Sequence, residues 1–280
     1  EEEITLLRLF AQMLVNLKLR AGAETKILEL TEQLEHKVEE RTAQLEASVK
    51  RLQSVNRELE TFTYSASHDL RTPLRGIEGF SALLLEEHGD KLDEQGREYL
   101  KRIQLATLHM SQLISDLLAY AHLEQMTEWI ESVDLGKLVM EVSKPFSHTL
   151  EARQGQLLLG VPPGLQVMAD PKGLSMALRN LMDNAIKFTP AARAPEIRIE
   201  AIEQPSTVLL RVSDRGLGFD MKHHDRIFGM FQRLHRQDQI PGTGIGLAMV
   251  HKAVERMGGR IWADSVPGEG TTFHIELPRG

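Results

Sequence analysis

The strongest constraint on the fold is a long helical pattern that runs from the start of the chain to about residue 125. Residues 5–20 place apolar side chains at helical spacing, and residues 27–62 follow a seven-residue repeat with polar interruptions. This repeat predicts a two-stranded parallel coiled coil, and the alternative is a single solvated helix. The a positions are Val38, Leu45, Leu52 and Leu59, and the d positions are Leu34, Arg41, Ser48, Val55 and Phe62.

Two further amphipathic helices are expected over residues 56–87 and 94–125, separated by a joint at residues 88–93. Gly89 can end the first helix, and Asp93 is a good N-cap for the second. Helices joined so closely form an antiparallel hairpin. Because one hairpin cannot bury both apolar faces, we expect two copies of the chain to form a four-helix bundle.

Beyond about residue 126 the pattern changes to short alternating strands separated by helices. Asp170-Pro171 predicts a helix from residue 171 to about 188, and another is expected from Ala248 to about Met257. Such a mixture predicts a two-layer α+β domain, so the fold class is α followed by α+β. The expected strands cover residues 156–161, 165–169, 197–202, 207–212, 260–264 and 271–277.

Composition excludes several classes of protein. The net charge of −7 argues against a nucleic-acid binder and against a polybasic membrane-surface protein. The absence of cysteine removes disulfides, thiolate nucleophiles and cysteine-based metal sites. No stretch approaches the roughly 18–20 apolar residues of a membrane span. The chain opens on Glu1 without Met, so we expect a fragment whose upstream sensor is missing.

The first group of residues suited to chemistry is Ser67–Leu74. His68 lies between apolar positions, Thr72 shares its helix face, and Asp69 lies at the edge of that face. A neutral imidazole is nucleophilic near pH 7, and a neighbouring carboxylate can accept the proton of its other nitrogen. A lone helix histidine is usually structural, but Pro73 inside a helix requires a reason.

The second group lies in the mixed α/β half. Asn180, Asn184 and Lys187 share one helix face, where carboxamide oxygens suit Mg²⁺ and the ammonium group can meet a phosphate. Asp214 follows a strand and is placed to accept a hydrogen bond from an amino group such as that of adenine. Gly216 and Gly218 then let the backbone pass close to a flat base.

A glycine-rich turn, Gly242–Leu247, opens the next helix and presents N–H groups to phosphate. Residues 227–241 before it contain few structure-forming residues and predict a mobile flap, with a plain surface loop as the alternative. The flap is expected to have two apolar anchors and two basic tips. These are Phe228, Phe231, Arg233 and His235.

Together these motifs resemble the two-component sensor histidine kinases of the His-kinase-A type, over about residues 56–280. Every box of that family occurs in order, and Asp69 stands where many members carry Glu. The similar segments are Ser67–Leu74 (H box), Asn180–Phe188 (N box), Asp214–Gly218 (G1 box), Phe228–Phe231 (F box), Gly242–Leu247 (G2 box) and Gly268–Phe273 (final glycine motif).

The resemblance implies four segments. They are the end of an upstream sensor or linker helix (1–25), a coiled-coil signalling helix (26–60), a dimerisation and histidine phosphotransfer domain (61–126) and a catalytic ATP-binding domain (127–280).

The resemblance also implies a site for ATP and Mg²⁺, in which Asp214 holds the adenine amino group and Asn184 ligates the metal. The implied nucleotide-binding set is Asn180, Asn184, Lys187, Asp214, Gly216, Gly218, Arg233, His235, Gly242, Thr243, Gly244, Gly246, Leu247 and Thr271.

The implied catalytic residues are His68, which attacks the γ-phosphate, Asp69 as its general base or orienter, and Thr72, which positions water for dephosphorylation. The implied partners are a second copy of the chain and the receiver domain of a response regulator, in the cytoplasm, with no nucleic acid and no membrane contact. The alternatives are an ATPase of the same nucleotide-binding fold and a kinase-dead dimeric scaffold. The helix bearing His68 opposes the first, and intact Asn184 and Asp214 oppose the second.

Overall fold

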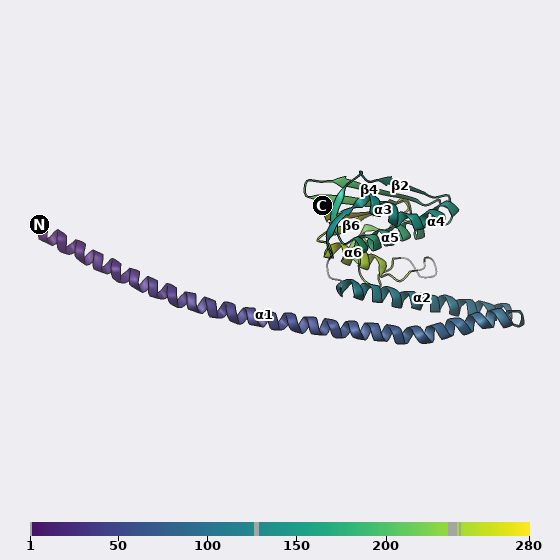
Figure 1. The fold of residues 1–280 in the computed structure, drawn as a ribbon, viewed down its shortest axis with the longest axis horizontal. Helices are drawn as coiled ribbons and strands as arrows, with labels where there is room; N and C mark the ends of the chain where they lie inside the picture. The colour runs from purple at the N-terminus through teal and green to yellow at the C-terminus, as the bar shows by residue number, and fades with distance from the viewer. Residues whose placement is uncertain (1, 126–128, 235–239, 241) are drawn as a thin grey trace. The chain divides into compact units, whose positions relative to one another are not determined.

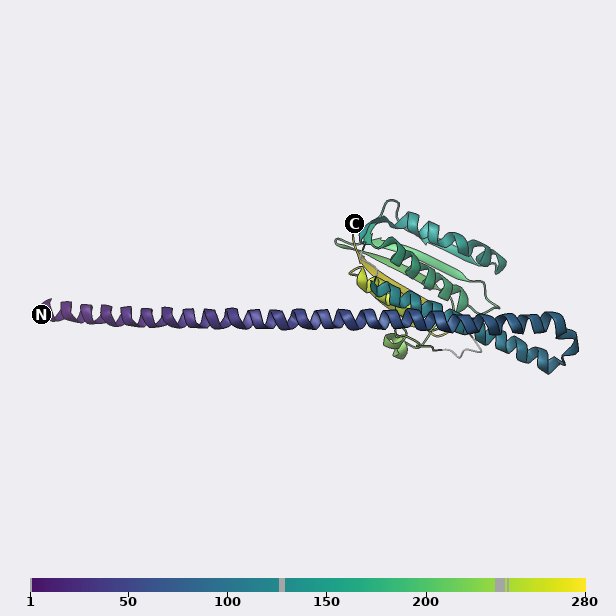
Figure 2. The same cartoon turned by 60° about the horizontal axis from the view of Figure 1, so that its bottom comes forward.

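The computed structural model describes residues 2–125, 129–234, 240 and 242–280, and for parts of the first helix it describes the backbone alone. The chain divides into two compact units, one ending at Phe62 and the other covering Thr63–Gly280. Figures 1 and 2 show two views of the chain, beginning with the long helix α1, Glu2–His88. Figure 1 and Figure 2 both show α2 running back from the joint that follows α1.

Helix α1 is continuous, whereas separate helical segments were expected before residue 88. That expectation is wrong because the sequence between the segments contains too little to end a helix. A single interior glycine such as Gly22 costs only about 1 kcal/mol relative to alanine. Pro73 also lies inside α1 without ending it.

The heptad positions of α1 carry an exposed apolar stripe. The exposed fractions of the described apolar side chains at a and d range from 55% for Val55 to 70% for Leu52. The side chains of Leu59 and Phe62 lie outside the described part of the structure. Packing of an apolar face usually supplies most of the stability of a helix. Within one chain, the described stripe leaves that contribution unused.

The joint of the hairpin follows its predicted chemistry. A short 3₁₀ turn, η1 (Gly89–Lys91), separates α1 from α2 (Glu94–Gln125). The Oδ1 atom of Asp93 accepts a hydrogen bond from the backbone N–H of Gly96 at 2.7 Å, as expected of an N-cap. The guanidinium of Arg97 donates to the carbonyl oxygens of Gly89 and Leu92 at 2.9 and 2.8 Å. The turn is therefore fixed from both sides.

The mixed half contains a five-stranded sheet in the order β2-β4-β5-β7-β6. The β2–β4 pair is parallel and the other pairs are antiparallel. A separate antiparallel pair joins β1 to β3. The strands are β1 (Glu131–Asp134), β2 (Gln156–Gly160), β3 (Gln166–Ala169), β4 (Glu196–Glu203), β5 (Thr207–Asp214), β6 (Arg260–Val266) and β7 (Gly270–Pro278).

One face of this sheet is packed under helices, as Figure 1 shows for α3, α5 and α6. Along β4, Ile197 and Ile199 are fully buried while Arg198 between them is exposed, which is the period of a strand with one core face. The α helices of this half are α3 (Leu135–Ser143), α4 (Ser147–Ala152), α5 (Pro171–Lys187) and α6 (Gly246–Arg256), and the 3₁₀ turns are η2 (Lys144–Phe146) and η3 (Met221–Arg226).

The expected helical half followed by an α/β half is confirmed. All six expected strands exist, with ends that differ by up to two residues, and Asp170 caps α5 by accepting from the N–H of Lys172 at 3.0 Å. The sequence interpretation missed β1, α3 and α4. These elements have only 4, 9 and 6 residues, which is short for a periodicity argument. Across the described residues, none of the helices carries an apolar stretch long enough to cross a membrane.

Candidate functional site

The polar face of α5 lies against the start of α6. Leu174, Leu178 and Leu181 bury the opposite face of α5 in the core, so Asn180 and Asn184 are left at its edge, partly exposed. Asn180 donates from Nδ2 to the carbonyl oxygen of Met176 at 3.0 Å. A Cβ atom placed on Gly246 would lie 2.7 Å from Oδ1 of Asn180. The N box and the glycine-rich turn are therefore neighbours in the fold, although they are far apart in the sequence.

Lys187, at the end of α5, reaches the same turn. Its ammonium group lies so close to Gly242 that a Cβ atom there would overlap it. It also lies 5.2 Å from the centroid of the Phe188 ring. Burial lowers the pKa of Lys187, Arg233 lowers it further, and Asp183 and Asp116 act in the opposite direction. This is a partly dehydrated cation beside a turn of glycines, an arrangement that suits a phosphate group.

Asp214 ends β5 as a partly buried carboxylate. Burial raises its pKa to about 6, and backbone hydrogen bonds from Gly216 and Thr271 act against that rise. The N–H of Gly216 donates to Oδ1 of Asp214 at 2.7 Å. Thr271 lies opposite Asp214 in the β5–β7 ladder. Asp214 is therefore held in place and is mostly ionised at pH 7, as an acceptor for an amino group must be.

The glycines after Asp214 allow close backbone approaches. A Cβ atom on Gly216 would lie 2.8 Å from the carbonyl oxygen of Phe188, and one on Gly218 would overlap the carbonyl oxygen of Val266. Gly218 also has a φ of +59°. The N–H of Leu217 donates to the carbonyl oxygen of Phe188 at 2.9 Å. The G1 loop is thus tied directly to the end of the N box.

The glycine-rich turn leads into α6, which begins at Gly246, two residues before its expected start. Gly244 has a φ of +75°, and a Cβ atom there would lie 2.9 Å from the carbonyl oxygen of Gln232. Thr243 donates from Oγ1 to Asp116 of α2 at 2.5 Å. Leu247 packs, partly buried, against the core of the α/β half. At Gly244 the turn therefore lies directly against the backbone of the preceding loop.

The flap before the turn is only partly as expected. Phe228 is half-buried, and its ring centroid lies 5.5 Å from that of His251. Phe231, however, is 56% exposed, so the prediction that it anchors the flap is wrong. Its φ of +58° turns the chain there, which is unusual for a bulky residue. Arg233 donates to the carbonyl oxygens of Gly242 and Ile240, and His235 lies outside the described residues.

The H-box residues lie on α1. The helix backbone is described at His68, but its side chain lies outside the described part of the structure. Asp69 and Thr72 are exposed. Ser67 and Leu74 are buried, with exposed fractions of 3% and 6%. This segment therefore presents Asp69 and Thr72 to solvent, together with Leu70, which is 55% exposed.

The residues of the α/β half fit an adenine nucleotide. They provide an ionised carboxylate at one end, a cation and a glycine turn at a helix start at the other, and close backbone contacts between them. For Mg²⁺ the fit is conditional. Among the described residues, no group of three or more His, Cys, Asp or Glu side chains could hold a metal. Asn184 would therefore bind Mg²⁺ only together with phosphate oxygens, as is usual for this ion.

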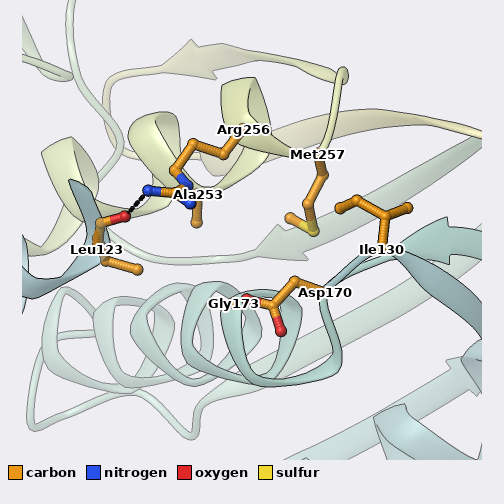
Figure 3. A pocket seen from close by; sticks show the side chains of 7 residues that line it. All are labelled: Leu123, Ile130, Asp170, Gly173, Ala253, Arg256 and Met257. Carbon is orange, nitrogen blue, oxygen red and sulfur yellow. Dashed lines mark hydrogen bonds between the residues drawn. The ribbon is translucent and has the colours of Figure 1, made fainter. Parts of the chain in front are cut away.

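A separate pocket lies at the other end of α5, between that helix, α6 and the end of α2 (Figure 3). There Arg256 donates a hydrogen bond to the carbonyl oxygen of Leu123. The lining residues are Leu123, Ile130, Asp170, Gly173, Ala253, Arg256 and Met257. None of these belongs to the N, G1 or G2 boxes, so this pocket is not the candidate nucleotide site.

Sequence reasoning missed the residues of α2 that contact the glycine turn. Besides Asp116, His109 lies with Nε2 at 3.3 Å from the carbonyl oxygen of Gly242. Leu123 of α2 also packs with Ile245 and Met249. A polar residue on an amphipathic helix carries no motif signal, so only the folded chain shows these contacts.

Two protein-family models match the chain. The His Kinase A (phospho-acceptor) domain matches residues 58–125, and the histidine kinase-, DNA gyrase B- and HSP90-like ATPase matches residues 169–280. Together they cover Ser67–Leu74 and every box of the α/β half.

Relatives of known name match across most of the chain. Phytochrome-like protein Cph1 of Synechocystis is 34% identical, over 82% of this chain and 30% of its own length. Sensor protein kinase WalK of Staphylococcus aureus is 29% identical, over 81% of this chain and 55% of its own. The crystal structure of full-length ShkA in complex with AMPPNP matches with a TM-score of 0.60 and 27% identity, over 78% of this chain and 45% of that one. The chain thus spans about 30% of the first phytochrome-like relatives.

Proposed function

Because this chain belongs to the sensor histidine kinases, we propose that it transfers the γ-phosphoryl group of ATP to His68 and then to an aspartate of a response regulator. The observation that carries this proposal is the meeting of Asn180 and Lys187 with the glycine-rich turn. The fixed carboxylate of Asp214 supplies the other end of the same site. The segment boundaries at residues 26, 61 and 127 form part of the proposal.

At the adenine end, Asp214 accepts a hydrogen bond from the exocyclic amino group. Its pKa of about 6 means that the acceptor is ionised above that pH and becomes a hydroxyl donor below it. Gly216 and Gly218 carry no side chain that would keep the backbone away from the base. The backbone N–H of Thr271 in β7 donates a hydrogen bond to the carboxylate of Asp214. Adenine recognition is therefore expected to weaken as the pH falls through 6.

At the phosphate end, Lys187 and the backbone N–H groups of the turn bind the phosphate oxygens, with the helix start of α6 adding its positive end. Arg233 holds Gly242 and, with His235, is assigned to phosphate contact. Asn184 would hold Mg²⁺ with Asn180 beside it. Mg²⁺, when bound, neutralises charge on the phosphate oxygens during transfer.

The acceptor is the ring of His68. One ring nitrogen forms the bond to the γ-phosphorus, the bond to the bridging oxygen breaks, and ADP leaves with that electron pair. The carboxylate of Asp69, the next residue, orients the ring and takes up the proton of its other nitrogen.

The chain is also proposed to dephosphorylate the regulator, with Thr72 positioning the attacking water. Thr72 is exposed one helix turn from His68, so its hydroxyl can reach a docked partner. Thr72→Ala is expected to slow regulator dephosphorylation while leaving phosphorylation of His68 intact. A Thr72→Ala chain that removes phosphate at the wild-type rate would remove this second activity from the proposal.

The working form is a homodimer. The exposed stripe of α1 and the two apolar faces of the hairpin provide the surface that a second copy covers. The receiver domain of a response regulator and a cytoplasmic location complete the proposal.

The proposal is tested with γ-labelled ATP and Mg²⁺. The full chain should acquire label that is lost in acid and kept in alkali, the signature of a phosphorylated imidazole, and His68→Ala should acquire none. His36→Ala, which changes an exposed histidine elsewhere on α1, is the matched control and should label normally. ATP hydrolysis without label would indicate an ATPase instead. Label that survives in His68→Ala would refute the assignment.

A further inference from the structure

Arg153 and Arg193 lie outside every recognised motif and donate hydrogen bonds to backbone carbonyl oxygens around the candidate nucleotide site. Arg153 lies just after α4, and its guanidinium donates to carbonyl oxygens at the end of the N box and just after it. The distances are 2.8 Å to Ile186, 3.0 Å to Thr189 and 3.0 Å to Pro190. A longer contact of 3.5 Å reaches the carbonyl oxygen of Arg193.

Ile186 carries one of the last carbonyl groups of α5, and Thr189, Pro190 and Arg193 follow the helix. The last carbonyls of α5 point out of the helix and carry its negative end. A guanidinium has five N–H donors in a planar fork, so one partly buried arginine can satisfy several of them. Arg153 therefore holds the end of α5 and the turn after it as one unit.

Arg193 extends this unit to two further loops. Its backbone belongs to the turn that Arg153 holds, and its N–H donates to the carbonyl oxygen of Pro190 at 2.9 Å. Its side chain donates from one guanidinium nitrogen to the carbonyl oxygen of Arg215 at 2.7 Å and to that of Gly268 at 3.4 Å. Arg215 lies in the G1 loop, and Gly268 lies in the turn between β6 and β7.

Backbone hydrogen bonds join the same three segments, which are the end of the N box, the G1 loop and the turn between β6 and β7. The N–H of Leu217 donates to the carbonyl oxygen of Phe188 at 2.9 Å, and the N–H of Gly268 donates to the carbonyl oxygen of Leu217 at 2.6 Å. The G1 loop is thus held at Arg215 by the Arg193 side chain and at Leu217 by the end of the N box. Gly216, whose N–H orients the carboxylate of Asp214, lies between these two fixed points.

We propose that Arg193, with its backbone held by Arg153, is a positioning residue that sets the adenine-reading edge of the nucleotide site. It acts through the G1 loop, by fixing where Gly216 presents its N–H and hence where Asp214 points. Adenine selectivity, more than phosphate binding, then depends on this arginine. This inference rests on the proposed ATP-dependent function.

The test compares full-length variants by calorimetric titration with ADP and with GDP, alongside thermal unfolding. Arg193→Ala should weaken ADP binding about threefold to tenfold, the range expected for one lost hydrogen-bonding side chain. It should weaken GDP binding less, so that the ADP-to-GDP affinity ratio falls. Arg193→Lys, which keeps one donor for Arg215, should recover part of the ratio.

Arg198→Ala is the matched control, since Arg198 is an exposed arginine of the same half, paired with Glu200 at 3.6 Å. It should leave both affinities unchanged. Arg193→Ala with an unchanged ratio, or with ADP and GDP affinities falling in parallel with the melting temperature, would overturn the inference alone. If the wild-type chain binds neither nucleotide, both the inference and the proposed function are overturned.

Discussion

Helices α1 and α5 both carry apolar stripes, but α5 buries its stripe within one chain, whereas the described heptad positions of α1 are exposed. Leu174 and Leu178 of α5 have exposed fractions of 0%, whereas Leu45 and Leu52 of α1 have 66% and 70%. A sheet and two helices complete the core around α5, while the described heptad positions of α1 lack such a cover. The α/β half can therefore be stable by itself, whereas on the proposed function α1 is stabilised by a second copy of the chain.

The largest expected effect tests this contrast directly. Leu174→Ala should lower the free energy of unfolding of the α/β half by about 2–5 kcal/mol, because it removes a fully buried side chain and leaves a cavity. Leu45→Ala should leave that free energy unchanged and weaken dimerisation. Urea unfolding followed by the fluorescence of Trp129 and Trp262 measures the change in the free energy of unfolding, and sedimentation measures dimerisation. An equal loss of α/β stability in Leu45→Ala would break the comparison.

The second effect is a pH dependence at Asp214. Its folded pKa is raised to about 6 from 3.8, so the folded chain is most favoured with this group protonated, and that stability is lost as pH rises through 6. Asp214→Asn should therefore stabilise the nucleotide-free chain by up to about 3 kcal/mol at pH 7.

The gain from Asp214→Asn should shrink as pH falls below 6 and vanish below about 4. Urea unfolding at several pH values gives the difference between the variant and the wild type. A difference that stays constant between pH 4 and 8 would show that the stability does not come from this carboxylate.

The third effect separates the two ends of the site. Lys187→Met should weaken ATP binding about tenfold, because a charge-assisted contact to phosphate is lost, and should leave adenosine binding unchanged. Lys172→Met, which alters an exposed lysine at the other end of α5, is the control. Titration of both ligands measures the effect. An equal loss for adenosine would mean that Lys187 supports the fold and not the phosphates.

The smallest effect concerns the exposed surface of the hairpin. Arg102 and Glu98 form an ion pair of 3.0 Å on α2, with side chains 72% and 52% exposed. Arg102→Ala should change the free energy of unfolding by less than about 0.5 kcal/mol, because solvent screens such pairs. Thermal unfolding checks this value. A loss above about 1 kcal/mol would mean that hairpin stability rests on its charges and not on apolar burial.

The sequence predicted most of the elements and placed the motifs on them, because periodicity and capping residues such as Asp93 and Asp170 act locally. It did not predict that Phe231 would be exposed or that α1 would be unbroken, since both depend on how whole segments pack. Arg153 and Arg193 were also missed. Their partners are backbone carbonyls, which leave no trace in the pattern of side chains.

The most direct test of a helical acceptor and an α/β donor site is a parallel measurement of histidine phosphorylation and ADP affinity in three chains. These are the wild type, His68→Ala and Asp214→Asn. His68→Ala should bind ADP like the wild type and carry no acid-labile phosphate, whereas Asp214→Asn should stay folded, lose ADP affinity and carry no phosphate. Acid-labile phosphate on His68→Ala, or wild-type phosphorylation of Asp214→Asn, would contradict the account.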